Sequence, residues 1–298
     1  MAPRLVSRAS ALMLAIACAA CGRGAEPPVV GESVARPARE ATEPGPAPLA
    51  SPTSVPAVAP ARPLRMVVIE HAPLRAAGVD YFLQQNGIAF DLIKVYEGER
   101  LPPWQEYDAI ISSGGPMSPE EFDDPRYPFL QAERDYVLEA VAAGRGFLGL
   151  CLGEQLLAHY LGGEVVRGDQ AEVGWLPVNL TPEGEADPLF QGVSSEFFVF
   201  QYHVDQVVRL PEGAVRLAGS PVAPVQAFRY RDLPVWGVQF HPEIRPSLAA
   251  EILSRSGRLA PEGGDLDAMI RLGFQVYSEA QETLFRNFFR EVGRSLVD

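Results

Sequence analysis

The sequence predicts an α/β domain in which helices cover both faces of a mainly parallel, doubly wound sheet. Two observations predict this class. Short apolar runs bounded by turn residues alternate with longer amphipathic stretches, and one cysteine stands in a glycine-rich strand-to-helix turn. The 298 residues are 47% hydrophobic and 21% charged, which excludes a wholly disordered chain. The roughly 230 residues of 65–298 fit one domain.

The first half of this domain carries the predicted parallel strands. Its apolar runs, each short enough for a buried strand, are residues 66–69, 90–95, 109–112 and 147–150. Apolar residues at helical spacing occupy 76–86 and 129–143. We therefore expect a crossover helix after each strand, as parallel pairing requires a long connection.

The second half, residues 164–243, favours short strands. The strand-like pieces are VGWLPVNL, FFVFQYHV, VRLAGS, VQAFRY and VWGVQFHPE. Arg231 and Asp232 lie between the last two and predict a hairpin turn. Helical patterns return at residues 247–256, 266–272 and 278–292.

The N-terminus has the features of an export signal. Arg4 and Arg8 precede the apolar stretch ALMLAIACAA, which ends in small residues and is too short to span a bilayer. Cys21 follows directly, and small residues before a cysteine resemble the lipobox of bacterial lipoproteins. We predict a signal peptide at 1–20, lipidation of Cys21 and an exported protein anchored to a membrane.

Other interpretations of this segment stay open. Cys18 is a second candidate for lipidation, and an ordinary secretory signal would also be cleaved after small residues. If translation begins at Met66, where the globular pattern starts, the protein is cytoplasmic. Residues 21–64 are dominated by proline, alanine and other small residues and hold no aromatic residue. We interpret them as an extended tether.

The net charge and the number of cysteines limit which partners and cofactors we expect. A formal net charge of −13 argues against nucleic acid as a partner. Two of the three cysteines belong to the signal region, so Cys151 is alone in the domain. A domain with one cysteine has no internal disulfide and no cysteine-based zinc cluster, and we expect no metal and no cofactor. Although free cysteines are often inert buried side chains, a lone thiol in an exported domain risks oxidation and so suggests a function.

Residues 149–153, Gly-Leu-Cys-Leu-Gly, have the form of a nucleophile elbow. They follow a predicted strand and precede the helical run EQLLAHYLG. The sharp turn forces the nucleophile into a strained backbone conformation and leaves no room for side chains beside it. It also places the sulfur at a helix N-terminus, which lowers a thiol pKa and stabilises an oxyanion. We therefore predict Cys151 as a nucleophile.

A thiol nucleophile needs an imidazole as its base and a carboxylate that orients the ring. His241 closes the predicted strand of VQFHPE, and Glu243 follows two residues later. Residues two apart on an extended chain point to the same side, and Pro242 keeps this segment extended. An isolated HPE would be a charged turn, but beside the elbow it predicts a base and its orienting group.

The motifs GLCLGEQ and GVQFHPE, in this order, resemble those of class I glutamine amidotransferase domains. The glycine loop SSGGPMS at 112–118 is similar to a third motif of that family. The resemblance spans about 65–292 and implies a flavodoxin-like three-layer sandwich with Cys151, His241 and Glu243 as a catalytic triad.

The resemblance also implies roles for four residues around the triad. The backbone N–H groups of Gly115 and Leu152 would bind the oxyanion. Gly114, in the glycine loop, and Gln155, after the elbow, would contact the bound glutamine.

Four further polar residues have open roles. His203 and Asp205 match a His-x-Asp element that lies near the substrate in such proteins, and we assign both to substrate binding. The alternative is a strand-end histidine satisfied by the neighbouring acid. For His71, which follows a strand, we favour an exposed loop over the pocket. Glu154 departs from the family's more familiar residues, and we favour capping of the first helical turn over a position facing the sulfur.

Outside the motifs, the chain looks most like stand-alone proteins similar to the amidotransferase part of GMP synthase. The sequence has no GxxxxGK[ST] phosphate loop. We therefore expect a hydrolase that cleaves the side-chain amide of glutamine or of a γ-glutamyl compound. One alternative is a glutaminase subunit that delivers ammonia to a separate synthetase. The other is a tethered binding module without turnover.

Overall fold

The computed structural model describes residues 62–73, 76–255 and 265–296. The predicted signal peptide, Cys21 and nearly all of the predicted tether lie outside these ranges. Within them, we find no helix with the length and apolar character needed to cross a membrane.

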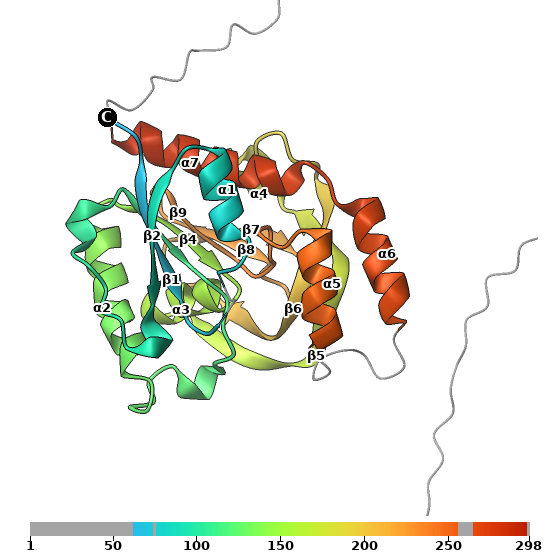
Figure 1. Ribbon diagram of the computed structural model, residues 1–298, viewed down its shortest axis with the longest axis horizontal. Coiled ribbons are helices and arrows are strands. Elements are labelled where there is room, and N and C mark those ends of the chain that lie inside the picture. The colour runs from blue at the N-terminus through green and yellow to red at the C-terminus, as the bar shows by residue number, and fades with distance from the viewer. Residues whose placement is uncertain (1–61, 74–75, 256–264, 297–298) are drawn as a thin grey trace, which may run out of the picture. The chain divides into compact units, whose positions relative to one another are not determined.

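A nine-stranded sheet forms the centre of the described domain (Figure 1). In chain order the strands are β1 (Arg65–Glu70), β2 (Ala89–Lys94), β3 (Ala109–Ser112), β4 (Gly146–Leu150), β5 (Glu164–Leu180), β6 (Glu196–Arg209), β7 (Ala214–Gly219), β8 (Ala227–Tyr230) and β9 (Val235–Val238). Their spatial order is β2-β1-β3-β4-β9-β8-β7-β5-β6. The strands from β2 to β9 in this order pair in parallel, and the others pair antiparallel.

Helices cover both faces of the parallel strands. In chain order the helices are α1 (Val79–Gln85), α2 (Pro128–Ala142), α3 (Leu152–Tyr160), α4 (Pro182–Ala186), α5 (Pro246–Arg255), α6 (Leu266–Val276) and α7 (Ala280–Ser295). Adjacent residues of β1 point to opposite faces of the sheet. Met66 and Val68 join the core under α1 and α7, whereas Val67 and Ile69 join the core under α2 and α3. The predicted three-layer α/β class is confirmed.

The helical pair α5 and α6 covers the antiparallel end of the sheet, beside β5 and β6 (Figure 1). A separate apolar cluster forms there around Trp175 and Phe200. Helices α5 and α6 thus pack on a different apolar cluster from the two that contain the residues of β1 and β3.

The connection between β2 and β3 differs from the prediction. Two short 3-10 helices, Val95–Glu97 and Trp104–Glu106, replace the expected crossover helix, so the prediction of a helix after every strand was wrong here. Gly98 and the Pro102-Pro103 pair interrupt any helical pattern in this segment.

Strand β5 is also longer than the sequence indicated. It spans 17 residues because it pairs with β6 along most of its length. The register shifts between Arg167 and Glu172, which marks a bulge. The polar stretch RGDQAE lies at this bulge, and its polarity concealed the strand.

Candidate active site

Cys151 lies at the sharp turn between β4 and α3. Its backbone has φ 53° and ψ −104°, a conformation that residues with a side chain rarely adopt. A Cβ at Gly149 would collide with the carbonyl group of Gly153, and a Cβ at Gly153 would collide with the carbonyl of Ser112. The two glycines therefore make the turn possible, and the sulfur sits at the N-terminus of α3.

His241 and Glu243 lie beside the cysteine, directly after β9. The ring nitrogen Nδ1 of His241 is 2.6 Å from Oε1 of Glu243, and both side chains are buried. The backbone N–H of His241 donates to the carbonyl of Phe200 on β6, which fixes the segment. The imidazole also contacts the side chain of Cys151. The structure thus brings together the three residues that the sequence predicted as a triad.

Three effects act on the pKa of His241. Burial lowers the pKa, but the carboxylate of Glu243 and the sulfur of Cys151 outweigh it and raise the pKa to about 10. The ring is therefore protonated at neutral pH when the sulfur is a thiolate. A protonated imidazole beside the sulfur can supply the proton that a leaving amine needs.

The glycine loop packs tightly against the elbow. A Cβ at Gly114 would lie 3.1 Å from Cε1 of His241 and 3.7 Å from Cβ of Cys151. A Cβ at Gly115 would collide with the side chain of Leu152. The structure therefore places the two residues predicted to bind the oxyanion in contact with each other, beside the nucleophile.

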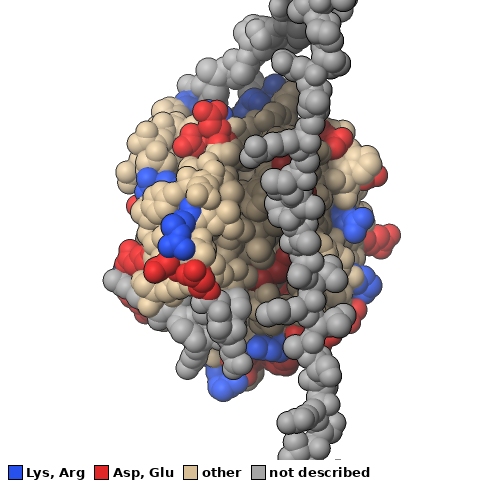
Figure 2. All heavy atoms as spheres, turned by 90° about the vertical axis from the view of Figure 1, so that its right-hand side faces the viewer, with Lys and Arg blue, Asp and Glu red and all other residues tan. Residues whose placement is uncertain are grey.

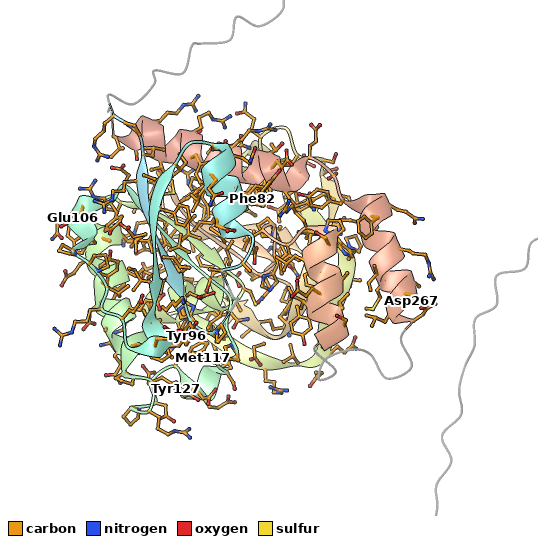
Figure 3. The ribbon with its side chains drawn as sticks, viewed as in Figure 1. Phe82, Tyr96, Glu106, Met117, Tyr127 and Asp267 are labelled. Atoms are coloured by element: carbon orange, nitrogen blue, oxygen red, sulfur yellow. The ribbon has the colours of Figure 1, made fainter. Side chains whose placement is uncertain are left out.

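A cavity of about 320 Å³ opens beside Cys151. Its lining comprises Gly115, Pro116, Met117, Ser118, Cys151, Gln155, Arg167, Tyr202, His203, Val204, Asp205 and His241. Met117, labelled in Figure 3, comes from the loop that follows β3. Most of the predicted site residues line the cavity. Arg167 also lines it, although the sequence did not predict a role for this residue.

Gln155 and His203 form part of a buried polar network at this cavity. The amide nitrogen of Gln155 donates to the backbone carbonyl of Asp205 and to the side-chain oxygen of Gln239, each at 2.9 Å. His203 Nδ1 lies 3.1 Å from the same carbonyl of Asp205, and Nε2 lies 3.2 Å from Oε2 of Glu172. His203 is therefore inside β6, and its acidic partner comes from β5 rather than from the neighbouring Asp205.

Asp205 and Arg167 place opposite charges at the cavity. Nη1 of Arg167 is 3.8 Å from Oδ1 of Asp205, too far for a hydrogen bond. The Arg167 side chain is 61% exposed, whereas that of Asp205 is 14% exposed. Burial raises the pKa of Asp205. Arg167 lies in the polar stretch that concealed the middle of β5, and no sequence signal marked it.

Glu154 does not cap α3, so that prediction was wrong. The side chain is fully buried against β9, and a Cβ at Gly237 would lie 2.5 Å from its Cγ. Neither carboxyl oxygen has a hydrogen-bond partner among the described residues. Burial, together with the neighbouring Cys151, raises the pKa of Glu154 well above its usual range. The surroundings of this carboxyl therefore disfavour its charged form.

His71 is buried, so the prediction of an exposed loop residue was wrong. It is 1% exposed and lies under α2, where Glu133 contacts its ring. A Cβ at Gly115 would lie 3.0 Å from the Cβ of His71, so His71 supports the glycine loop from behind rather than lining the cavity.

This constellation can carry out acyl transfer. It combines a thiol nucleophile, an imidazole that carries a proton, and a glycine loop beside the N-terminus of a helix. Among the described residues, no group of three or more His, Cys, Asp or Glu side chains is placed to hold a metal ion. On the face shown in Figure 2, acidic and basic side chains are interspersed and do not gather into a basic patch.

Comparison with known proteins identifies the relatives. A model of the family described as "Glutamine amidotransferase class-I" matches residues 79–257. The chain is 38% identical over 116 residues to one subunit of a glutamine-hydrolysing GMP synthase from Pyrococcus furiosus, a match that covers 39% of this chain and 60% of that subunit. It is 31% identical over 196 residues to a glutamine amidotransferase-like protein from Salmonella typhimurium, a match that covers 65% of this chain and 81% of that protein.

A solved structure supports the same assignment. The crystal structure of a glutamine amidotransferase from Thermotoga maritima superposes with a TM-score of 0.68 at 26% identity, and covers 80% of this chain and all of that one. Because the family model matches more than half of the chain, around the same elbow and histidine that the structure brings together, the chain belongs to the class I glutamine amidotransferase family.

Proposed function

We propose that the protein hydrolyses the side-chain amide of glutamine or of a γ-glutamyl compound. One observation carries this proposal. Cys151 occupies a strained elbow beside a cavity, in contact with a histidine that Glu243 holds at 2.6 Å. A protein that only bound its ligand would not need a strained thiol paired with a buried imidazolium.

The first half of the reaction forms a thioester. The thiolate of Cys151 attacks the amide carbon, and the electron pair of the carbonyl moves to its oxygen. The backbone N–H groups of Gly115 and Leu152 stabilise that charge. The C–N bond then breaks as the nitrogen takes the proton of His241, so ammonia or an amine leaves and the acyl group stays on the sulfur.

The second half returns the free enzyme. A water molecule attacks the thioester carbon, and the neutral His241 takes one of its protons. The C–S bond breaks, which releases the acid and restores the thiolate beside the imidazolium. Glu243 stabilises the charged ring in both halves, since it lies at Nδ1.

The charges of the cavity support a substrate with a free amino-acid end. Arg167 and Asp205 form a loose ion pair at 3.8 Å, with no hydrogen bond between them. The guanidinium of Arg167 would bind the α-carboxylate, and Asp205 would bind the α-ammonium. Gln155 and His203 line the adjoining wall, whereas Gly114 packs against His241 and Cys151 and does not line the cavity.

The relative from Pyrococcus furiosus favours a second candidate function. In this alternative the chain is a glutaminase subunit that delivers ammonia to a separate synthetase. The chain spans 60% of that relative's length, so the partner is a proposal for this protein. The two functions differ in one measurable property, because a hydrolase is active alone, whereas the glutaminase of a synthetase is activated by its partner.

The test is a substrate screen on the purified protein. We expect ammonia release from glutamine, or amine release from γ-glutamyl dipeptides, and none from Cys151→Ala. Blocking the α-amino or α-carboxyl group of the substrate should raise KM. A glutamine analogue that carries an electrophile should label Cys151, and failure to label it would favour a binding module without turnover.

Export and anchoring form a separate proposal, which rests on residues 1–21 and their resemblance to a lipobox. We propose that Cys21 becomes the lipidated N-terminus and that the tether separates the domain from the membrane. Mass spectrometry of the mature N-terminus tests this. An unmodified chain that begins at Met66 would establish a cytoplasmic protein instead.

A further inference from the structure

A further buried pair of histidine and carboxylate, outside the cavity, lies behind the glycine loop. His71 follows β1, Glu133 belongs to α2, and His71 Nε2 is 2.7 Å from Oε2 of Glu133. Both side chains are fully buried. The hydroxyl of Ser112 donates to the other oxygen of Glu133 at 2.8 Å. Both carboxyl oxygens are therefore occupied, and the ring has one fixed orientation.

The other ring nitrogen of His71 contacts the loop itself. Nδ1 lies 3.1 Å from the backbone carbonyl of Ser113, and a carbonyl only accepts, so Nδ1 carries a hydrogen. Burial lowers the pKa of His71, but the charge of Glu133 and the hydrogen bonds to Glu133, Ser113 and Gly114 outweigh it and raise the pKa. The ring thus donates to the loop from one nitrogen and meets a carboxylate at the other.

Stability alone does not account for this pair. Removing two charges from water is costly, and apolar side chains of similar volume are often equally stable or more stable in such positions. The pair lies where the loop is most constrained, since Gly115 is enclosed by His71 on one side and Leu152 on the other. A hydrogen bond to Ser113 fixes the peptide groups that lead to Gly115.

We propose that His71 and Glu133 are positioning residues that hold the glycine loop so that the N–H of Gly115 points at the developing oxyanion. This inference rests on the proposed amide hydrolysis. Neither residue lines the cavity, so neither touches the substrate. Their effect reaches the reaction through the carbonyl of Ser113, and it is largest when the oxyanion forms.

The double substitution H71M/E133M tests this role. It removes both charges together and keeps similar volumes, so the domain should stay folded, with Tm lowered only by the lost hydrogen bonds to Ser112 and Ser113. We expect kcat to fall about ten- to hundredfold, somewhat less than the loss of an oxyanion donor. Alkylation of Cys151 by iodoacetamide forms no oxyanion, so its rate should stay unchanged. A purely structural role would lower Tm and leave kcat of the folded protein intact.

Glu133→Gln keeps the side-chain shape and decides the question if the double variant fails to fold. We expect a smaller loss of kcat, about three- to tenfold, with KM nearly unchanged. Asp187→Asn is the matched control, because Asp187 is also buried and ion-paired, to Arg229, but lies away from the cavity. It should lower Tm without lowering kcat.

The outcomes separate this inference from the proposed function. A wild type that releases no ammonia or amine overturns the hydrolase itself. An active wild type whose kcat stays within about twofold in Glu133→Gln, and in H71M/E133M where that variant folds, overturns only the positioning role. Equal losses of kcat and of the alkylation rate would also overturn it, because the change would then reach the thiol and not the oxyanion.

Discussion

Two of the buried histidine–carboxylate pairs, one at the nucleophile and one behind the glycine loop, differ in what the second ring nitrogen meets. His241 lies 2.6 Å from Glu243 and also contacts Cys151, whereas His71 lies 2.7 Å from Glu133 and contacts the carbonyl of Ser113. The same chemical pair therefore faces a thiol in one place and a backbone carbonyl in the other, and we propose a different role for each.

The carboxylates of the two pairs also differ in how many of their oxygens have protein partners. Both oxygens of Glu133 have protein partners, from His71 and Ser112. Glu243 uses one oxygen, and its Oε2 has no partner among the described residues. In the pair behind the loop, both carboxyl oxygens and both ring nitrogens therefore have protein partners. The carboxylate at the nucleophile has a protein partner at one oxygen only.

The largest expected effect distinguishes the two histidines. His241→Gln should lower kcat by about 10³-fold, because general acid–base catalysis is worth about 10²- to 10⁴-fold. It should also slow alkylation of Cys151 at neutral pH, since the thiolate loses its cationic partner. The measurement is steady-state kcat together with the alkylation rate. If His71→Gln lowers both as much as His241→Gln does, the two pairs do not have different roles.

The next largest effect is a change in the pH dependence of activity when one of the two carboxylates is replaced. Glu243 raises the pKa of His241, so Glu243→Gln should lower that pKa from about 10. Activity that needs the imidazolium is lost as pH rises through this pKa. The alkaline limb of the pH–activity profile should therefore lie at lower pH in Glu243→Gln than in the wild type. A pH profile of kcat/KM measures the shift. Glu133→Gln should leave the limb in place, and an equal shift in that variant would contradict the comparison.

A third effect tests the loop that lies between the pairs. Gly115→Ala places a methyl group against Leu152 and His71, so the loop must move away from the elbow. We expect kcat to fall about 10²-fold, as for the loss of an oxyanion donor. Gly98→Ala is the control, because Gly98 has a positive φ but a Cβ there meets no atom. Gly98→Ala should lower Tm only. Equal kcat in the two variants would place the oxyanion site elsewhere.

The smallest effect concerns Glu154, a buried carboxyl with no basic partner among the described residues. Its raised pKa means that the folded state keeps a proton that the unfolded state releases, so stability falls as pH rises above 4.5. Glu154→Met should remove this dependence and stabilise the fold by about 1–2 kcal/mol at pH 7. Thermal unfolding at several pH values measures the difference. A variant that loses stability at pH 7 would show that the acid has a favourable partner.

The contrast between the pairs also shows how much of the site the sequence could predict. Cys151 and its glycines are adjacent, so turn geometry predicted the elbow. The contact of Glu243 with His241 was also predicted, but its basis was wrong: Pro242 and Glu243 form a turn closed by Ile244, not an extended segment. His71 and Glu133 are 62 residues apart, and only the packing of α2 over the end of β1 brings them together. Glu172 and His203 lie opposite each other on the paired strands β5 and β6, a contact that the sequence did not indicate.

The fold was predictable to a similar extent. Apolar runs identified β1, β3 and β4 because those strands are buried on both faces, and the run at 90–95 identified β2 although that edge strand is only partly buried. The polar bulge in β5 gave no such pattern, and Arg167 stayed hidden within it. Glu154 was misplaced because an acid in the first turn of a helix usually faces solvent, whereas Gly237 leaves space for it beneath the elbow.

Capture of the acyl intermediate tests the central claim most directly. The protein is mixed with glutamine or a γ-glutamyl dipeptide, quenched in acid and digested, and the peptide that contains Cys151 is weighed by mass spectrometry. We predict a glutamyl thioester on Cys151 in the wild type, and neither thioester nor ammonia or amine release in Cys151→Ala. Hydrolysis that persists in Cys151→Ala, or an acyl group on another residue, would contradict the account.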